Sequence, residues 1–345
     1  MKALLTAVLL LAAFGCNKKA EISPTVDPAT LKMFTPLQSE VPPPSGSLSG
    51  QQIDLGRMLY YETRLSTDQK ISCNTCHGLA AYGVDGEPTS GGHKGQKGTR
   101  NSPTVYNAAG HVAQFWDGRA PTVEEQAKGP VMNPVEMGMP SQKIVVAVLK
   151  SMPEYVQAFK AAFPAQKDPV TFNNMAVAIG AFERKLLTPS RWDKFLQGDV
   201  AALTPAEKQG FNTFISVGCQ TCHAGALVGG AMYQKLGVIK PYPDESDLGR
   251  FQLTKVEGDK MVFKVPSLRN IEKTGPYFHN GKVGTLPEAI DRMAEYQVGK
   301  KLTDPQIQSI VTWLKSLTGD LPADYIRPPK LPASTANTPK PEAAD

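Results

Sequence analysis

Two short motifs in the sequence combine a pair of cysteines with a histidine at the same spacing. Residues 73–77 read Cys-Asn-Thr-Cys-His, and residues 219–223 read Cys-Gln-Thr-Cys-His. In a C-x-x-C-H motif both thiols bond covalently to the vinyl groups of a haem, and the adjacent imidazole becomes a ligand of its iron. The sequence therefore predicts two haem c groups. Their attachment residues are Cys73, Cys76 and His77 for the first haem and Cys219, Cys222 and His223 for the second.

Zinc binding and thiol redox chemistry are the other common uses of C-x-x-C pairs. A four-thiolate zinc site usually has its pairs about 15 to 20 residues apart and needs no histidine after each pair. A thioredoxin-type pair lies near a βαβ pattern, which the flanking sequences lack. Four of the five cysteines lie in the two motifs and the fifth is Cys16, so no thiol is left for a structural disulfide.

The first sixteen residues have the pattern of a secretory signal. Lys2 precedes an apolar run over residues 3–15, which is too short to span a membrane. Cys16 resembles the cleavage and lipidation site of bacterial lipoproteins, although Ala13 stands where that signal prefers leucine. Residues 1–16 are therefore interpreted as a signal peptide that ends at a lipidated cysteine of a periplasmic lipoprotein. Ordinary signal cleavage is the alternative.

Composition limits the class of protein. A chain of 345 residues is long enough for two domains, which agrees with the two haem motifs. The hydrophobic fraction of 41% and the charged fraction of 20% are typical of a soluble globular protein. The net charge is +5 without a long basic run, which argues against nucleic acid but would favour an anionic partner. Membrane contact is expected only through the lipid anchor.

A repeated unit leads into each haem motif. Residues 17–50 are rich in proline and predict a tether without helices. Apolar residues then recur at helical spacing over residues 51–61, and the first motif follows after a loop. The order returns where Thr204 caps a helix that leads to the second motif. This unit resembles a cytochrome c domain, so we expect a mostly α fold with two such domains, residues 51–188 and 189–325.

The remaining segments are predicted to be helices joined by loops. Short strands are expected within the loop-rich residues 224–264. The proline-rich segment from Leu321 is expected to begin as an ordered wrap and to continue in disorder, with residues 326–345 as a flexible tail. Further helices are expected over residues 122–128, 141–149, 153–162, 170–186, 285–297 and 303–317.

A glycine-rich segment, residues 90–98, follows the first motif and contains one histidine, His93. Such a segment has low intrinsic order and could move as a loop. His93 either ligates the first haem iron on its second face or is a solvated loop side chain.

The chain as a whole resembles the bacterial dihaem cytochrome c peroxidases of the MauG and CcpA type. The resemblance covers about residues 50–320, and a lipidated leader would fit a membrane-attached member of the MacA type. The motifs that carry it are Val-Asp-Gly at 84–86, Asn-Ser-Pro-Thr at 101–104, Phe-Trp-Asp-Gly-Arg-Ala at 115–120, Lys-Gly-Pro at 128–130, Gly-Pro-Tyr-Phe-His-Asn-Gly at 275–281 and Ser-Leu-Thr-Gly at 316–319.

The resemblance implies that the two haems have different roles, one in electron transfer and one in the reaction with peroxide. The family holds its electron-transfer haem by a histidine and a methionine, which match His223 and Met293, and the thioether raises the reduction potential. The alternative for Met293 is core packing on an amphipathic helix. The first haem, held by His77, would meet hydrogen peroxide. The residue that matches His93 would leave this iron when the other haem is reduced.

Three further residues match the family's catalytic positions. Glu136 matches the acid/base that moves a proton between the two peroxide oxygens, and Gln126 matches the residue that orients peroxide. Without the resemblance, both would be interpreted as solvated side chains. Trp116 matches the aromatic residue that lies between the haems on the electron path. A buried core indole is the plainer interpretation of Trp116, and the two roles are compatible.

The resemblance also implies a calcium ion and a dimer. Asn101, Thr274 and Pro276 match the family's calcium ligands at the domain interface, two of them acting through backbone carbonyls. The sequence alone would predict no calcium site, because it has no cluster of carboxylates. His111 and His279 are left as core histidines or neighbours of a haem propionate. Family members are commonly homodimers, so a homodimer is expected.

The leading prediction is an enzyme, a cytochrome-c peroxidase that reduces hydrogen peroxide to water. Its electrons would come from a c-type cytochrome or a similar small redox protein and enter at the C-terminal haem. The alternative is a non-enzymatic dihaem relay of electrons across the periplasm, but a pure carrier needs neither Glu136 nor a releasable His93. Oxidation of a protein substrate, as in MauG, is disfavoured because MauG has a tyrosine where Met293 stands.

Overall fold

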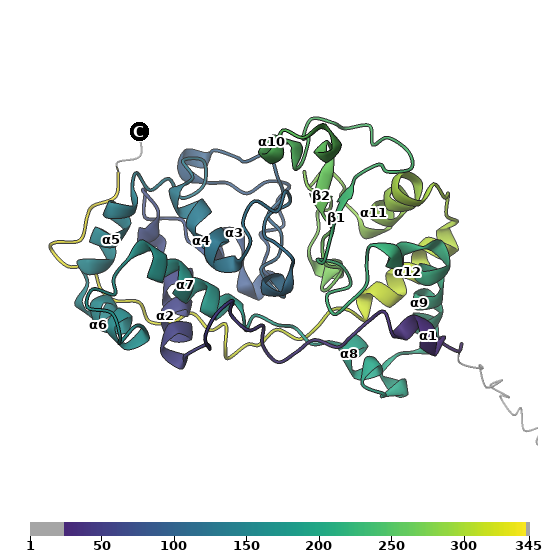
Figure 1. Ribbon diagram of the computed structural model, residues 1–345, viewed down its shortest axis with the longest axis horizontal. Coiled ribbons are helices and arrows are strands. Elements are labelled where there is room, and N and C mark those ends of the chain that lie inside the picture. Colours follow the sequence, from purple (N-terminus) through teal and green to yellow (C-terminus); the bar gives the residue numbers. More distant parts are fainter. Residues whose placement is uncertain (1–23, 343–345) are drawn as a thin grey trace, which may run out of the picture.

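The structure is a computed structural model that describes residues 24–342, and it consists mainly of helices joined by long loops. Two groups of helices lie at opposite ends of an elongated molecule, each around its own apolar core (Figure 1). Between them lies a two-stranded antiparallel sheet of β1 (Tyr233–Lys235) and β2 (Val262–Lys264). The mostly helical fold and the short strands are as predicted. Within the described residues, no helix has the length and apolar character to cross a bilayer.

In the first half, the helix that precedes the first motif crosses a later helix very closely. A Cβ at Gly56, on α2 (Gly50–Tyr60), would lie 1.8 Å from the carbonyl oxygen of Ala178, on α7 (Phe172–Glu183). Glycine is therefore required for this crossing, because a side chain would collide with the facing backbone. The other helices of this half are α3 (Cys73–Cys76), α4 (Val123–Met132), α5 (Gln142–Lys150) and α6 (Pro153–Ala162).

The second half repeats this arrangement. A Cβ at Gly210, on α9 (Pro205–Val217), would lie 2.1 Å from the carbonyl oxygen of Ser309, on α12 (Asp304–Lys315). Trp192 and Trp313 fill the core beside this crossing with their rings 5.4 Å apart. The other helices of this half are α8 (Arg191–Leu196), α10 (Phe251–Thr254) and α11 (Leu286–Met293), which continues as a π-helix over Ala294–Val298.

The N-terminal segment differs from the predicted tether. Residues 24–49 contain a one-turn helix, α1 (Pro28–Leu31), and run along the body (Figure 1). Phe34 is 4% exposed and packs edge-on against Trp192. The carbonyl oxygen of Pro42 accepts a hydrogen bond of 2.6 Å from Arg184. The prediction of a helix-free tether is therefore wrong for this part, because distant aromatic and arginine side chains bind a segment with little structure of its own. Residues 17–23 lie outside the described residues.

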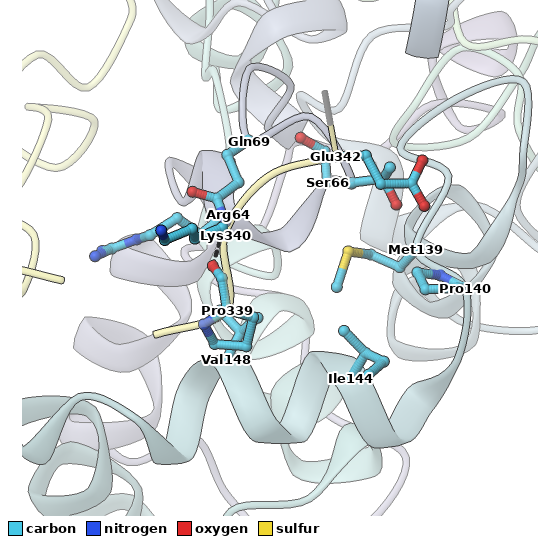
Figure 2. Close-up of a pocket in the computed structure, with 11 residues that line it drawn as sticks. Arg64, Ser66, Gln69, Met139, Pro140, Ile144, Val148, Pro339, Lys340 and Glu342 are labelled. Atoms are coloured by element: carbon cyan, nitrogen blue, oxygen red, sulfur yellow. Dashed lines mark hydrogen bonds between the residues drawn. The ribbon is translucent and has the colours of Figure 1, made fainter. Parts of the chain in front are cut away.

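The C-terminal segment also differs from the prediction of a flexible tail. Figure 1 shows it crossing from the second half to the first and ending there. Tyr325 stacks on Phe182 at 5.0 Å, and Ile326 is buried in the core of the first half. The N–H of Glu342 still donates to the carbonyl of Thr67. Residues 326–342 are thus held on the first half, and Figure 2 shows their last members lining a pocket with Met139 and Val148.

Candidate haem sites

The first motif forms a single helical turn, α3, which holds its residues at fixed positions. Ser72 and Thr75 cap this turn through a hydrogen bond of 3.0 Å from the backbone N–H of Ser72. The N–H of His77 donates to the carbonyl of Cys73, and the carbonyl of His77 accepts a hydrogen bond of 2.8 Å from the Tyr60 hydroxyl. Tyr60 belongs to the helix that precedes the motif, so that helix fixes the backbone of the histidine.

The side chains of this motif are chemically suited to haem attachment. Cys73 and Cys76 are free thiols, and burial raises the pKa of both. Burial lowers the pKa of His77, although the backbone at Gly83 opposes the shift. A neutral imidazole is the form that ligates a metal. The motif therefore offers two thiols and a neutral histidine on one short turn.

The glycine-rich loop after the first motif lies against the segment that carries Glu136. Its ends meet in a bridge between Gly91 and Lys97, and the N–H of His93 donates to the carbonyl of Glu136 at 2.7 Å. Nδ1 of His93 is buried, makes no hydrogen bond and lies 3.8 Å from a carboxylate oxygen of Asp68. The structure thus places His93 and Glu136 side by side.

Glu136 is positioned by the end of α4. The side-chain amide of Asn133, the residue that caps this helix, donates to Glu136 at 2.9 Å. Burial raises the pKa of Glu136, whereas the charge of Arg119 and the bond from Asn133 act in the opposite direction. Glu136 also raises the pKa of Cys76, so its carboxyl lies within electrostatic reach of the first motif. Gln126 lies half-buried on α4 itself.

The second motif follows α9 directly through Gly218, which has a φ of 105°. The N–H of His223 donates to the carbonyl of Cys219 at 3.1 Å. Nδ1 of His223 lies 3.3 Å from the carbonyl oxygen of Val228, and burial lowers the pKa of His223 to about 4. A hydrogen bond from Nδ1–H to a carbonyl leaves Nε2 available to a metal, which is the usual arrangement for a ligating histidine. Burial raises the pKa of Cys219 to about 12.

Met293 lies at the end of α11, where the helix changes to a π-helix. π-Helical turns are uncommon and often occur at functional sites. The Met293 side chain packs against a third apolar cluster that includes Tyr242 and Phe263. The carbonyl of Tyr296 accepts hydrogen bonds from the N–H groups of Ile239 and Lys240, so the loop beside this cluster is fixed to the π-helix. Both interpretations of Met293, as a haem ligand and as a core residue, are compatible with a side chain that packs against this cluster.

Trp116 lies between the two halves and is bonded to both. Its indole N–H donates to the carbonyl of Asn101 at 2.9 Å, and its own carbonyl accepts a hydrogen bond of 2.8 Å from the N–H of Lys264 on β2. The His279 ring meets the indole edge-on at 6.5 Å. The N–H of Asn101 in turn donates to the carbonyl of His279. The predicted electron-path residue is therefore part of the junction itself.

The polar groups left unpaired in this structure fit a cofactor better than a bare metal ion. Four of the five histidines have a buried ring nitrogen without a hydrogen bond, namely His77, His93, His111 and His279. All four motif cysteines are free thiols. Within residues 24–342, no three side chains of the His, Cys, Asp and Glu types gather as a metal cage. Thiols paired with single histidines and no shared cage are the donor set that two haems require.

The structure reveals contacts of the site that sequence patterns did not identify. Tyr60 on the first histidine's carbonyl and Asp68 beside His93 have no motif of their own. Asn133 stands three residues before Glu136, a spacing at which an asparagine often caps a turn. The sequence could therefore have indicated this contact. The buried contact between Lys264 and His111 joins residues far apart in the sequence and had none.

Comparisons with known proteins agree with this geometry. Residues 50–201 match the family described as di-haem cytochrome c peroxidase. The cytochrome c551 peroxidase of Pseudomonas aeruginosa is 46% identical over 316 residues, which cover 90% of this chain and 90% of that protein. The methylamine utilization protein MauG of Methylorubrum extorquens is 33% identical over 270 residues, covering 77% of this chain and 75% of MauG.

Solved structures show the same architecture. The crystal structure of a MauG-like protein associated with microbial copper homeostasis has a TM-score of 0.75 at 28% identity, and the match covers 85% of this chain and 98% of that chain. The diheme peroxidase BthA from Burkholderia thailandensis has a TM-score of 0.63 at 20% identity, covering 89% and 94% of the two chains. At that identity, the second match shows the fold alone.

Proposed function

Because the chain belongs to the di-haem cytochrome c peroxidase family and is a peroxidase, we propose that it reduces hydrogen peroxide at the first site with electrons that enter at the second. The observation that carries this proposal is the contact between His93 and Glu136 beside the first motif. It joins a histidine on a glycine-rich loop to a buried carboxyl of raised pKa. Haem, when bound at both motifs, supplies the redox chemistry of its iron.

Glu136 is the proton carrier in this proposal. A carboxyl with a raised pKa can hold and release a proton near neutral pH. Glu136 would take the proton from one peroxide oxygen and deliver it to the other, while Asn133 orients its carboxyl. Gln126, half-buried on the preceding helix, would hold the peroxide by hydrogen bonding. The complete reaction takes up two electrons and two protons and converts one hydrogen peroxide into two waters.

His93 controls access to the first site. In the resting protein its imidazole would help His77 to hold the first haem, and it would withdraw when the second site is reduced. The unpaired Nδ1 supports this role, since few side-chain hydrogen bonds have to break as the ring moves. The loop is bonded to the segment that carries Glu136 through the backbone bond of His93 and through a bond from the Gln96 side-chain amide to the carbonyl of Pro134, so a loop movement would also alter the position of the acid/base.

The second site would receive and store electrons through His223 and Met293. Beside it, Val238 and Ile239 are 47% and 63% exposed on the loop that is bonded to the π-helix. The exposed Lys235 lies near these apolar residues, and the exposed Lys240 beside them forms an ion pair with Glu295. Apolar contacts within a charged rim suit a small redox protein such as a c-type cytochrome. Trp116 would carry the electrons from this half to the first.

Three further features belong to the same proposal. Calcium would bind Asn101 together with the backbone carbonyls of Thr274 and Pro276. The Asn101 amide nitrogen donates to the carbonyl of Glu87 at 2.9 Å, which turns its oxygen away and leaves that oxygen available to a hard cation. A periplasmic location with a lipid on Cys16, and a homodimer, follow from the leader and from the family resemblance. Cys16 lies outside the described residues.

The proposal is tested by mixing the haem-loaded protein with a reduced c-type cytochrome and hydrogen peroxide. We expect oxidation of the cytochrome that depends on peroxide, with two cytochromes oxidised for each peroxide consumed. A protein that exchanges electrons with the cytochrome but consumes no peroxide would instead be an electron relay. Peroxide consumption is measured independently of cytochrome absorbance, so the two functions give separate readings.

A further inference from the structure

A buried lysine at the junction of the two halves has no acidic partner among the residues that the structure describes. Lys264, the last residue of β2, is 6% exposed, and burial lowers its pKa to about 8. Among residues 24–342, no carboxylate forms an ion pair with it. A buried ammonium group is costly unless an anion or several acceptors compensate it. Something outside the polypeptide must therefore complete this site if the lysine is charged.

The contact that Lys264 does make leaves a second donor without an acceptor. Its Nζ lies 3.1 Å from Nδ1 of His111, so the ammonium group donates and Nδ1 accepts. A neutral imidazole that accepts at Nδ1 carries its proton on Nε2. Nε2 of His111 is buried and has no hydrogen bond. The pair thus presents an ammonium group and an N–H donor that both call for an anionic acceptor.

The surroundings of the pair relate it to the second motif and to Trp116. The N–H of Lys264 donates to the carbonyl of Trp116 at 2.8 Å. Gly230 packs against the ring of His111, where a Cβ would lie 2.6 Å from Cδ2. The preceding residue, Gly229, packs in the same way against the imidazole of His223. His111 and His223 therefore pack against two consecutive glycines, which places the two imidazoles near each other.

We propose that Lys264 and His111 bind a propionate carboxylate of the second haem at the junction beside Trp116. This inference rests on the proposed haem binding and not on peroxide reduction. A haem carries two propionates, and each is a carboxylate that two neighbouring donors can hold. The buried positive charge destabilises the oxidised iron relative to the reduced iron, so it raises the reduction potential of the second site. It would also hold the haem edge that faces the electron path.

The test compares the reduction potentials of both haems in the loaded wild-type protein and in Lys264→Met, measured by spectroscopic redox titration. We expect Lys264→Met to lower the potential of the second haem more than that of the first. Lys264→Arg keeps the charge and should restore most of the shift. Lys315→Met removes an exposed lysine on α12 and serves as the matched control, with both potentials unchanged. An unchanged second potential in fully loaded Lys264→Met would overturn the proposal.

His111→Leu is the second variant, in case Lys264→Met fails to fold or to bind haem. It removes the Nε2–H donor without supplying another one and keeps the lysine, and we expect a smaller fall of the same potential. A second potential that stays at the wild-type value in this variant contradicts the proposed binding. Neither measurement involves peroxide, so a protein that binds both haems but reduces no peroxide would fail the proposed function and leave this inference standing.

A free anion such as phosphate is the other source of an acceptor. Titrations of the wild-type protein in increasing phosphate, at constant ionic strength, separate the two sources. A haem propionate predicts a second potential that does not depend on phosphate. A potential that follows the phosphate concentration, and does so no longer in Lys264→Met, would assign the site to a free anion and would overturn the proposal.

Discussion

The two halves of the molecule share a framework and differ in what they place around the motif. In both halves, the helix that leads into the motif crosses a later helix at a glycine, Gly56 in the first and Gly210 in the second. In the first half a glycine-rich loop with His93 lies next to the motif. In the second half Met293 lies at a helix end within a packed cluster. We propose that the first arrangement lets His93 move and that the second holds Met293 in place.

Four carboxyls show a parallel difference between the halves, although Glu124 of the first half, which is paired with Arg184, also has a lowered pKa. In the first half, burial raises the pKa of Glu136, and it raises that of Glu183 to about 8. In the second half, burial opposes ionisation of Asp193 and Glu207, but hydrogen bonds from Arg269 and Arg191 lower the pKa of both. Carboxyls that can exchange protons near neutral pH therefore lie in the half that is proposed to reduce peroxide.

The largest effect is expected from Glu136→Gln, which removes the proton carrier of the first half. Turnover should fall by about 10²- to 10⁴-fold, the usual range for loss of a general acid/base, while both haem spectra stay as in the wild type. Glu125→Gln, on α4 and in an exposed ion pair with Lys128, is the matched control and should retain activity. Undiminished peroxide turnover in Glu136→Gln would remove this residue from the mechanism.

Met293→His tests whether the second half holds a thioether ligand. Replacing a methionine ligand by histidine lowers the potential of a haem, so the second haem should become harder to reduce and activation of the first should be impaired. Redox titration measures the shift, and the first haem of the same sample is the internal reference. If the second potential stays where it was, another residue is the ligand and Met293 is a core residue.

Removal of residues 333–345 tests whether the C-terminal segment belongs to the first half. It deletes the hydrogen bonds that Arg64 donates to Ser334 and that Gln69 donates to the carbonyl of Pro339. We expect the free energy of unfolding to fall by about 1–3 kcal/mol, because the chain entropy regained by the freed segment offsets part of the lost contacts. The loss should appear in the unfolding of the first haem's half. Removal of residues 343–345 alone is the control. Equal stability of both truncated proteins would argue that the segment contributes nothing.

The smallest effect concerns the pH dependence of stability that Glu183 confers. Its pKa is about 8 in the folded protein and about 4.5 in the unfolded chain, so folding takes up a proton between these values. The contribution to stability is fully present below pH 4.5 and is lost as the pH rises through 8. Glu183→Gln should therefore lose less stability than wild type between pH 6 and pH 9 in chemical denaturation. An equal loss in both proteins would contradict the assigned shift.

Local patterns predicted the elements that position the motifs. Thr204 as a cap, with proline at the first helical position, indicated α9, and the structure begins that helix at Pro205. The expected helix over residues 153–162 is α6 with the same bounds. Periodicity and capping succeeded here because their signals lie within a few residues of each other.

Long-range contacts could not be predicted in this way. Proline-rich composition indicated a tether and a flexible tail, but Phe34 packs on Trp192 and Tyr325 on Phe182. These partners are remote in the sequence, so no local pattern reports them. The same holds for the bond between His93 and the backbone of Glu136, which brings together two residues that the family resemblance had named separately.

The most direct test of the division between the two halves is the absorption spectrum of the half-reduced, haem-loaded protein, recorded with and without hydrogen peroxide. We expect the first iron to lose one protein ligand and to respond to peroxide, whereas the second should keep both of its ligands. If both irons keep two protein ligands in every redox state and peroxide changes neither spectrum, the two halves do not differ as described, and the protein conducts electrons without reducing peroxide.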